Sequence, residues 1–157
     1  DFDGVFTNNK VIINEKGEES VLCDRSDGLA IELLNNLKKE SGWNLELLIL
    51  TRERNKVVAK RAEKLKIKCF YGIEDKLEFI KKFLVDRSLK NDGLIYLGND
   101  INDIESMLFS GFSVSPSDAN QSVLNISDLV INKKGGDGFI REFVEKFLYD
   151  QDLIKLL

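Results

Sequence analysis

The chain has 157 residues, a formal net charge of −4 and 43% hydrophobic residues. This length suits a single domain that can bury a sizeable core. A mildly acidic balance without a basic stripe argues against nucleic acid as a partner. No apolar run is long enough to cross a bilayer, so we expect no membrane partner.

Residue types that are rare or missing restrict the possible chemistry. The sequence has no histidine, which excludes Ser-His and Cys-His nucleophile systems and His-ligated zinc. Cys23 and Cys69 are too few and too far apart for a disulfide scaffold or a zinc site. As free thiols they suit a reducing cytosol, so we expect a cytoplasmic protein. Any reaction must depend on carboxylates, Lys, Arg, hydroxyl groups and a hard cation with oxygen ligands.

Short apolar runs alternate with helical patterns along the chain. The first half predicts a hairpin of residues 10–14 and 19–23, a helix over 27–41, a strand over 45–50, a helix over 53–66 and a strand over 68–72. The second half predicts a helix over 75–84, a strand over 93–98, a helix through Met107, a strand over 112–116, a helical stretch from near Ser117, a strand over 128–132 and a last helix from about Phe139.

This alternation predicts an α/β fold, with a Rossmann-like parallel sheet and helices on both of its faces. Ligands of such sheets bind beyond the carboxyl ends of the strands. Five loops are expected at that edge, namely those with Asp1, Thr51, Asp75 and Lys76, residues 98–100, and residues 133–138. A site of this kind normally lies at the carboxyl end of a buried strand, and no strand precedes Asp1 in this sequence. We therefore expect an apolar strand upstream of Asp1, in a longer polypeptide.

Asp1 and Asp3 are the candidate nucleophile and acid/base. Side chains two positions apart point the same way on or just past a strand. Asp1 can attack phosphorus to form an aspartyl-phosphate, while Asp3 protonates the leaving alkoxide and later takes a proton from water. Gly4 lets the backbone approach the phosphoryl group. Taken alone, Asp-x-Asp-Gly is equally typical of a simple turn.

Thr51 and Lys76 follow in an order that fits phosphoryl transfer. Thr51 ends an apolar run before a helix, where its hydroxyl and nearby N–H groups can hold phosphate oxygens. Lys76 can neutralise the charge that builds up on the transferred group. Each residue also has an ordinary interpretation, as a helix cap and as a solvated lysine.

The GNDIND segment, residues 98–103, supplies candidate oxygen ligands for Mg²⁺. The predicted metal site comprises Asp1, Asp3 through its carbonyl, and one or two of Asn99, Asp100 and Asp103. The same residues also favour a capped helix start.

Several charged residues could set specificity. Asp24, Arg25, Arg61 and Arg141 are each typical of a protein surface, but together they suggest an anionic substrate that carries more than a phosphate.

The motifs DFDGVFT, Thr51, Lys76 and GNDIND together resemble those of the haloacid dehalogenase-like phosphatases. The segments CDRSDGLAI, ILTRERNKVVAKRAEKLKI, GIEDKL and GGDGFIREFVEKFL are similar to one capless subgroup. That subgroup includes the 3-deoxy-D-manno-octulosonate 8-phosphate phosphatases, the nonulosonate 9-phosphate phosphatases and the C-terminal domain of acylneuraminate cytidylyltransferases. Many members have Asp where this chain has Asn99.

The resemblance implies a single capless domain over residues 1–157, with a small hairpin flap. It implies an Mg²⁺-dependent phosphatase that acts on a small acidic sugar phosphate. It places Asp24, Arg25, Arg61 and Asn102 on the substrate side. It also implies a homotetramer in which Arg141 serves a neighbouring subunit.

Two alternatives remain. In the first, the domain resembles an oligomerisation module of a fused or associated cytidylyltransferase, with little or no hydrolase activity. A response-regulator receiver also uses Asp, Thr, Lys and Mg²⁺, but its acidic pair precedes the phosphorylated Asp, whereas here the paired Asp comes first and another acidic cluster last.

Overall fold

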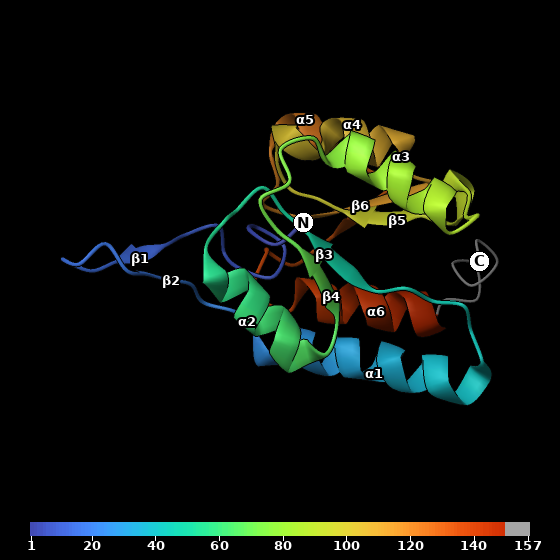
Figure 1. Ribbon diagram of the computed structural model, residues 1–157, viewed down its shortest axis with the longest axis horizontal. Coiled ribbons are helices and arrows are strands. Elements are labelled where there is room, and N and C mark those ends of the chain that lie inside the picture. Colours follow the sequence, from blue (N-terminus) through green and yellow to red (C-terminus); the bar gives the residue numbers. More distant parts are fainter. Residues whose placement is uncertain (150–157) are drawn as a thin grey trace.

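The computed structural model describes residues 1–149 and places helices on both faces of parallel β-sheet (Figure 1). One sheet pairs β3 (Leu48–Leu50) with β4 (Lys68–Phe70). The other has the order β5 (Ile95–Leu97), β6 (Phe112–Pro116) and β7 (Leu129–Ile131), with all pairs parallel. The predicted α/β class is confirmed.

The helices form two layers. On one face lie α1 (Arg25–Ser41), α2 (Lys56–Leu65) and α6 (Phe139–Tyr149), and on the other α3 (Lys76–Asp86), α4 (Ile104–Phe109) and α5 (Gln121–Leu124) (Figure 1). Short 3₁₀ turns occupy Asn91–Gly93 and Ile101–Asp103. A buried apolar cluster lies under each helical layer, as expected for apolar strands covered on both faces.

Side-chain caps explain where the observed helices differ from the predicted ones. The helix predicted over 27–41 begins at Arg25, because the Asp24 carboxylate accepts a hydrogen bond from the Ser26 amide. The helix predicted over 53–66 begins only at Lys56, where Asn55 caps the Val57 amide. The helix predicted from near Ser117 starts later, at Gln121. Most strands are shorter than predicted, and only the one over 112–116 keeps its bounds.

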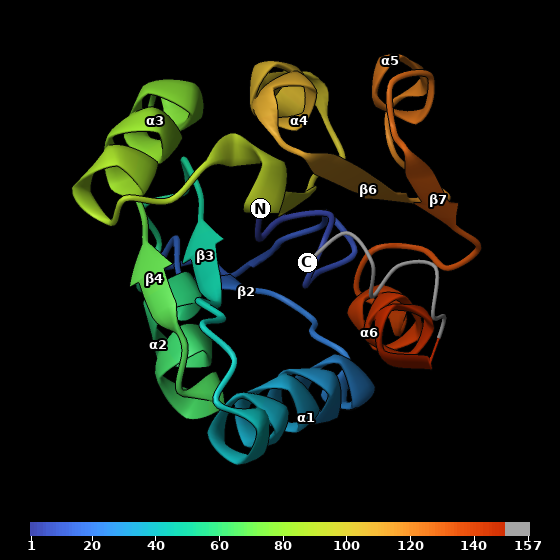
Figure 2. The same ribbon diagram turned by 90° about the vertical axis from the view of Figure 1, so that its right-hand side faces the viewer.

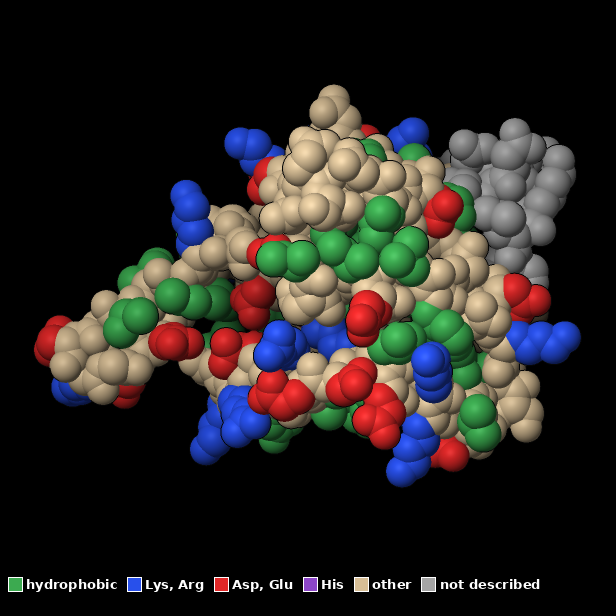
Figure 3. Space-filling view, turned by 90° about the horizontal axis from the view of Figure 1, so that it is seen from above, with side chains coloured by type: hydrophobic (Ala, Val, Ile, Leu, Met, Phe, Trp, Pro, Cys, Tyr) green, Lys and Arg blue, Asp and Glu red, His purple; other side chains and the backbone are tan. Residues whose placement is uncertain are grey.

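The predicted hairpin is present as β1 (Ile12–Ile13) and β2 (Glu19–Ser20), which pair antiparallel. It projects from the body of the molecule, and hydrophobic side chains lie along it (Figure 3). Val11, Ile12, Ile13 and Leu22 are all more than half exposed. The hairpin therefore offers an apolar surface that the described residues do not cover.

Asp1 lies between the two sheets (Figure 2). Its nitrogen donates to the Leu97 carbonyl at 2.8 Å, which places it at the carboxyl end of β5. Behind it, an apolar cavity of about 580 Å³ is lined by residues of β3, β5, α1, α3 and α6. Within residues 1–149, no helix combines the length and apolarity that a membrane crossing requires.

Asp27 joins the first helix to the last. This fully buried residue lies in the first turn of α1, and its Oδ1 accepts a hydrogen bond from the Arg141 amide at 2.9 Å. It thereby satisfies one of the unpaired amides at the start of α6. Its Oδ2 is buried without a hydrogen-bond partner among the described residues. Burial raises the pKa of the Asp27 carboxyl to about 6.

This raised pKa predicts a pH dependence of stability. Because the folded state keeps its proton on Asp27 up to about pH 6 while the unfolded chain loses it near the ordinary value of 3.8, stability falls as pH rises through this window. The Asp27→Asn variant lacks this contribution. We expect the difference in unfolding free energy, wild type minus variant, to be larger at pH 4 than at pH 7, by on the order of 2 kcal/mol.

Urea unfolding of both proteins at the two pH values measures this difference, because the other carboxyl groups titrate alike in both and cancel. An equal difference at pH 4 and pH 7 contradicts the assignment.

Candidate active site

A buried lysine lies at the centre of the predicted site. The Lys76 ammonium is 2.9 Å from Asp1 Oδ1 and 2.7 Å from Asp103 Oδ1. The three side chains are at most 7% exposed. Burial lowers the pKa of Lys76, and the Asp103 carboxylate opposes this shift. The structure thus brings together residues that are 75 and 27 positions apart from Lys76 in the sequence.

Asp103 holds this lysine in place. Besides Lys76, its Oδ1 accepts from the Tyr96 hydroxyl at 2.8 Å, and its Oδ2 accepts from the Asn99 and Asp100 amides at 3.0 and 3.3 Å. Both oxygens are therefore fully engaged. This geometry favours a positioning role for Asp103 over the predicted role of metal ligand.

Asp1 is oriented through one of its oxygens. Oδ1 accepts from the Phe2 amide at 2.7 Å and pairs with Lys76. Among the described residues, no hydrogen bond reaches Oδ2. An ionised carboxylate with one oxygen held and the other open is suited to nucleophilic attack.

Asp3 lies beside Asp1 and is held by Thr7. The Thr7 hydroxyl donates to Asp3 Oδ1 at 3.3 Å and accepts from the amides of Gly4 and Asn9. Asp3 is half-buried, and this burial raises the pKa of its carboxyl. A carboxyl group in this state can both donate and accept a proton.

Thr51 directly follows the last residue of β3, and it is 2% exposed. Its amide donates to Phe70 of the neighbouring strand, and its hydroxyl oxygen accepts from the Glu53 amide at 3.1 Å. The hydroxyl proton remains available to an anion. Thr51 is thus a well-positioned donor at the sheet edge.

Asn99 carries the strongest sign of a metal. Its Oδ1 is buried and has no hydrogen-bond partner among the described residues. A buried amide oxygen without a partner costs on the order of 1–3 kcal/mol unless a ligand satisfies it. A hard cation does so. Gly4 lies against this side chain so closely that a Cβ there would fall 1.9 Å from Asn99 Nδ2.

If the prediction holds, the ligands would be the Asp1 carboxylate, the Asp3 carbonyl and the Asn99 amide oxygen, which are all oxygen donors of the kind that Mg²⁺ prefers. Within residues 1–149 no three Asp, Glu, Cys or His side chains form a metal cluster. Asp100 caps the following turn, since its Oδ1 accepts from the Ile101 amide at 2.8 Å.

Two of the predicted substrate-side residues lie together. Arg61 Nη2 donates to the Asp24 carbonyl at 3.0 Å, while Arg61 Nε is buried without a partner among the described residues. Cys23, next to Asp24, forms a β-bridge with Thr7. The Asp24–Arg61 pair is thereby connected to the loop that carries Asp3.

The remaining predictions are less closely linked to the site. Arg25 is exposed at the start of α1. The Arg141 guanidinium pairs with Glu145 one turn along α6, not with a predicted site residue. Asn102, in contrast, is exposed and lines a cavity beside Lys76.

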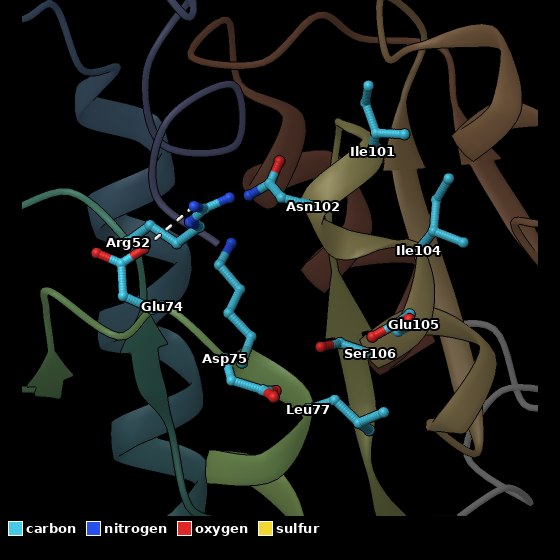
Figure 4. Close-up of a pocket in the computed structure, with 10 residues that line it drawn as sticks. Arg52, Glu74, Asp75, Leu77, Ile101, Asn102, Ile104, Glu105 and Ser106 are labelled. Atoms are coloured by element: carbon cyan, nitrogen blue, oxygen red, sulfur yellow. Dashed lines mark hydrogen bonds and ion pairs between the residues drawn. The ribbon is translucent and has the colours of Figure 1, made fainter.

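This cavity, of about 460 Å³, opens between the start of α3 and the turn before α4. Arg52 and Asn102 approach each other across it (Figure 4). Sequence reasoning gave no role to Arg52, nor to Thr7 and Tyr96, which orient Asp3 and Asp103. Thr7 belongs to the first motif, so its role could have been predicted from the sequence. Tyr96 lies in an apolar run that predicts a strand, and nothing in that pattern indicates its contact with Asp103.

Comparison with known proteins shows which proteins this chain resembles. The 3-deoxy-D-manno-octulosonate 8-phosphate phosphatase KdsC of Yersinia pestis is 30% identical over 156 residues, which cover 99% of this chain and 80% of that protein. N-acylneuraminate cytidylyltransferase A of Danio rerio is 27% identical over 145 residues. The match covers 92% of this chain, which therefore spans about a third of the cytidylyltransferase. No family model matches the sequence.

Solved structures share the fold. A HAD family hydrolase from Streptomyces avermitilis superposes with a TM-score of 0.86 at 35% identity, covering 97% of this chain and 89% of the other. The 3-deoxy-D-manno-octulosonate 8-phosphate phosphatase of Moraxella catarrhalis, solved with magnesium, phosphate and KDO, gives 0.86 at 28% identity, with 98% and 85% covered.

The contacts of Asp103 predict a large effect of a small substitution. Asp103→Asn replaces an oxygen that accepts hydrogen bonds with an NH₂ group that faces donors, and it leaves Lys76 with one carboxylate fewer. We expect a loss of about 3–5 kcal/mol in unfolding free energy, as for other broken buried ion pairs.

Asp100→Asn is the matched control in the same loop, because its Oδ1 can still cap Ile101. Its expected cost is below about 1 kcal/mol. Urea unfolding in EDTA compares the two without a contribution from metal binding, and equal stability of the variants contradicts the positioning role of Asp103.

Proposed function

Because this chain belongs to the haloacid dehalogenase (HAD) family of phosphatases, we propose that it hydrolyses an acidic sugar phosphate through an aspartyl-phosphate intermediate. The observation that carries the proposal is the buried arrangement of Asp1, Lys76 and Asp103 beside the unsatisfied oxygen of Asn99. Phosphoryl transfer requires a carboxylate oxygen that can attack phosphorus, a fixed positive charge and an oxygen atom that can bind a metal ion. Asp1, Lys76 and Asn99 are the residues proposed to supply them.

The reaction follows from the residues in two displacements. Asp1 Oδ2 attacks phosphorus while the bond from phosphorus to the sugar oxygen breaks, and Asp3 gives its proton to that oxygen. Asp3 then takes a proton from water, the hydroxide oxygen attacks the phosphorus, and the Asp1 carboxylate leaves. The Thr51 hydroxyl and Lys76 hold the phosphoryl oxygens in both steps.

Mg²⁺ is the cofactor, and when bound it neutralises phosphoryl charge and helps to orient the group. Asp1, the Asp3 carbonyl and Asn99 are its proposed ligands, with Asp100 next in line and Asp103 disfavoured by its four hydrogen bonds. A neutral amide ligand gives a weaker site than a carboxylate would.

The substrate is a nonulosonate 9-phosphate or a 3-deoxy-octulosonate 8-phosphate. The Moraxella catarrhalis relative binds KDO, phosphate and magnesium together, which supports this class. Asp24, Arg25, Arg61 and Asn102 remain the proposed residues on the sugar side.

We further propose a homotetramer. The exposed apolar side chains of the hairpin support this assembly, since such a surface is typical of a subunit contact. In it, Arg141 would serve the site of a neighbouring subunit.

The similarity to part of a cytidylyltransferase favours one alternative, in which the domain mainly supports the assembly of a fused or associated cytidylyltransferase. The presence of Asp1, Asp3, Thr51 and Lys76, with the Lys76 ammonium 2.9 Å from Asp1, supports the enzyme instead.

Replacing the nucleophile tests the mechanism. Asp1→Asn should lower kcat at least about 1,000-fold, because an amide does not attack phosphorus, while circular dichroism stays unchanged. Asp86→Asn, at the exposed end of α3, is the control and should keep full activity. Turnover by the Asp1→Asn variant near the wild-type rate would exclude Asp1 as the nucleophile.

Metal removal tests the ligand set. EDTA should stop hydrolysis and Mg²⁺ should restore it. By titration calorimetry, Asn99→Ala should weaken Mg²⁺ binding by about tenfold, and Asn99→Asp should strengthen it, because Mg²⁺ prefers carboxylates. Asn36→Ala, on the exposed side of α1, is the control. Unchanged Mg²⁺ affinity in both Asn99 variants contradicts the assignment.

A further inference from the structure

One positively charged side chain that lines the cavity beside Lys76 has no role in the proposed chemistry. Arg52 directly follows Thr51, and its side chain reaches the wall of the cavity that Lys76 and Asn102 also line. Arg52 and Asn102 point toward each other, whereas Asp75 and Glu105 extend toward the opposite end (Figure 4). Arg52 is therefore the guanidinium group at this end of the cavity, where Glu74 also lies.

An ion-pair network fixes Arg52 without cancelling its charge. Arg52 Nη2 lies 3.1 Å from Glu74 Oε2, and Arg54 Nη2 lies 3.0 Å from Glu74 Oε1. One carboxylate is thus shared by two guanidinium groups, so the three side chains carry a net charge of +1. Lys76 is in the opposite situation, because one ammonium serves two carboxylates. Because Arg52 shares its carboxylate partner Glu74 with Arg54, its positive charge is only partly neutralised.

Lys76 and Arg52 differ in how exposed they are, so they can reach different parts of a substrate. The side chains of Lys76 and Asp1 are at most 7% exposed, and the proposed binding place of the phosphoryl group is beside them. The Arg52 side chain is 53% exposed and lies at the mouth of the site. A group on the sugar that extends out from the phosphate meets Arg52 and Asn102, not Lys76.

We propose that Arg52 is a specificity-determining residue, which binds a carboxylate of the substrate together with Asn102 at the mouth of the active site. The inference rests on the proposed function and names the residue that reads the acidic part of the sugar. A guanidinium group pairs with a carboxylate through two parallel hydrogen bonds, and the amide of Asn102 adds a further donor. Glu74 holds the guanidinium in place before the substrate arrives.

Arg54 provides a matched control. It pairs with the same carboxylate and is still more exposed, at 75%, but it does not line the cavity. If Arg52 only contributes a surface ion pair, Arg52→Gln and Arg54→Gln should behave alike.

The test compares kcat/KM of wild type, Arg52→Gln, Arg52→Lys and Arg54→Gln with Mg²⁺ on two substrates. One is KDO 8-phosphate, which carries a carboxylate, and the other is p-nitrophenyl phosphate, which does not. For Arg52→Gln we expect a loss of about tenfold or more on KDO 8-phosphate and a change within about twofold on p-nitrophenyl phosphate. Arg52→Lys should lie in between, and Arg54→Gln should match wild type.

Three outcomes overturn the proposal: an equal loss on both substrates, which would assign Arg52 to the phosphoryl group; no loss on either; or an equal effect of Arg54→Gln. Calorimetric binding of KDO itself to wild type and Arg52→Gln gives a second reading that needs no turnover. If wild type hydrolyses neither substrate, the proposed function fails, yet weaker KDO binding by Arg52→Gln still supports the role of Arg52. Equal or absent KDO binding in that case overturns it.

Discussion

The site depends on one buried ammonium group placed between two carboxylates. Burying Lys76 alone would be costly, and so would burying Asp1 or Asp103 alone. Together they compensate one another, and Tyr96 and two backbone amides satisfy the remaining acceptor positions of Asp103. Because Lys76 comes after β4, Asp103 after β5 and Asp1 before both, this contact also fixes the relative positions of the loops that carry them.

The sequence predicted the order of the elements and the edge of the sheet at which the loops with Asp1, Thr51 and Lys76 meet. Apolar runs such as LELLIL and GLIYLG predicted buried strands because each is only about as long as a strand and shorter than a typical helix. Asp1, Thr51 and Lys76 could be assigned because parallel strands all end at one edge. The first residues of the helices were harder to predict. Several neighbouring polar residues can cap a helix, and only the structure shows that Asp24 caps α1 and Asn55 caps α2.

Roles that depend on side-chain direction could not be read from the sequence. From the sequence alone, Asn99, Asp100 and Asp103 are equally suitable as oxygen ligands. In the structure, only Asn99 among these three has a buried side-chain oxygen without a hydrogen-bond partner, whereas Asp103 accepts four hydrogen bonds. Arg52 and Arg54 look alike in the segment TRER, but only one lines the cavity. Arg141 finds Glu145 on its own helix, a pairing that spacing alone allows but does not require.

The link between Asp27 and Arg141 spans 114 positions of the chain. Alongside it, the Gly136 amide donates to the Val5 carbonyl, so the loop before α6 packs on the loop that follows Asp1. Contacts between such distant segments close large loops and form slowly. During synthesis, the segment with Asp1 leaves the ribosome well before α6, but it gains these neighbours only after α6 has emerged. The loop that follows Asp1 is therefore made long before its contacts with the start of α6 can form.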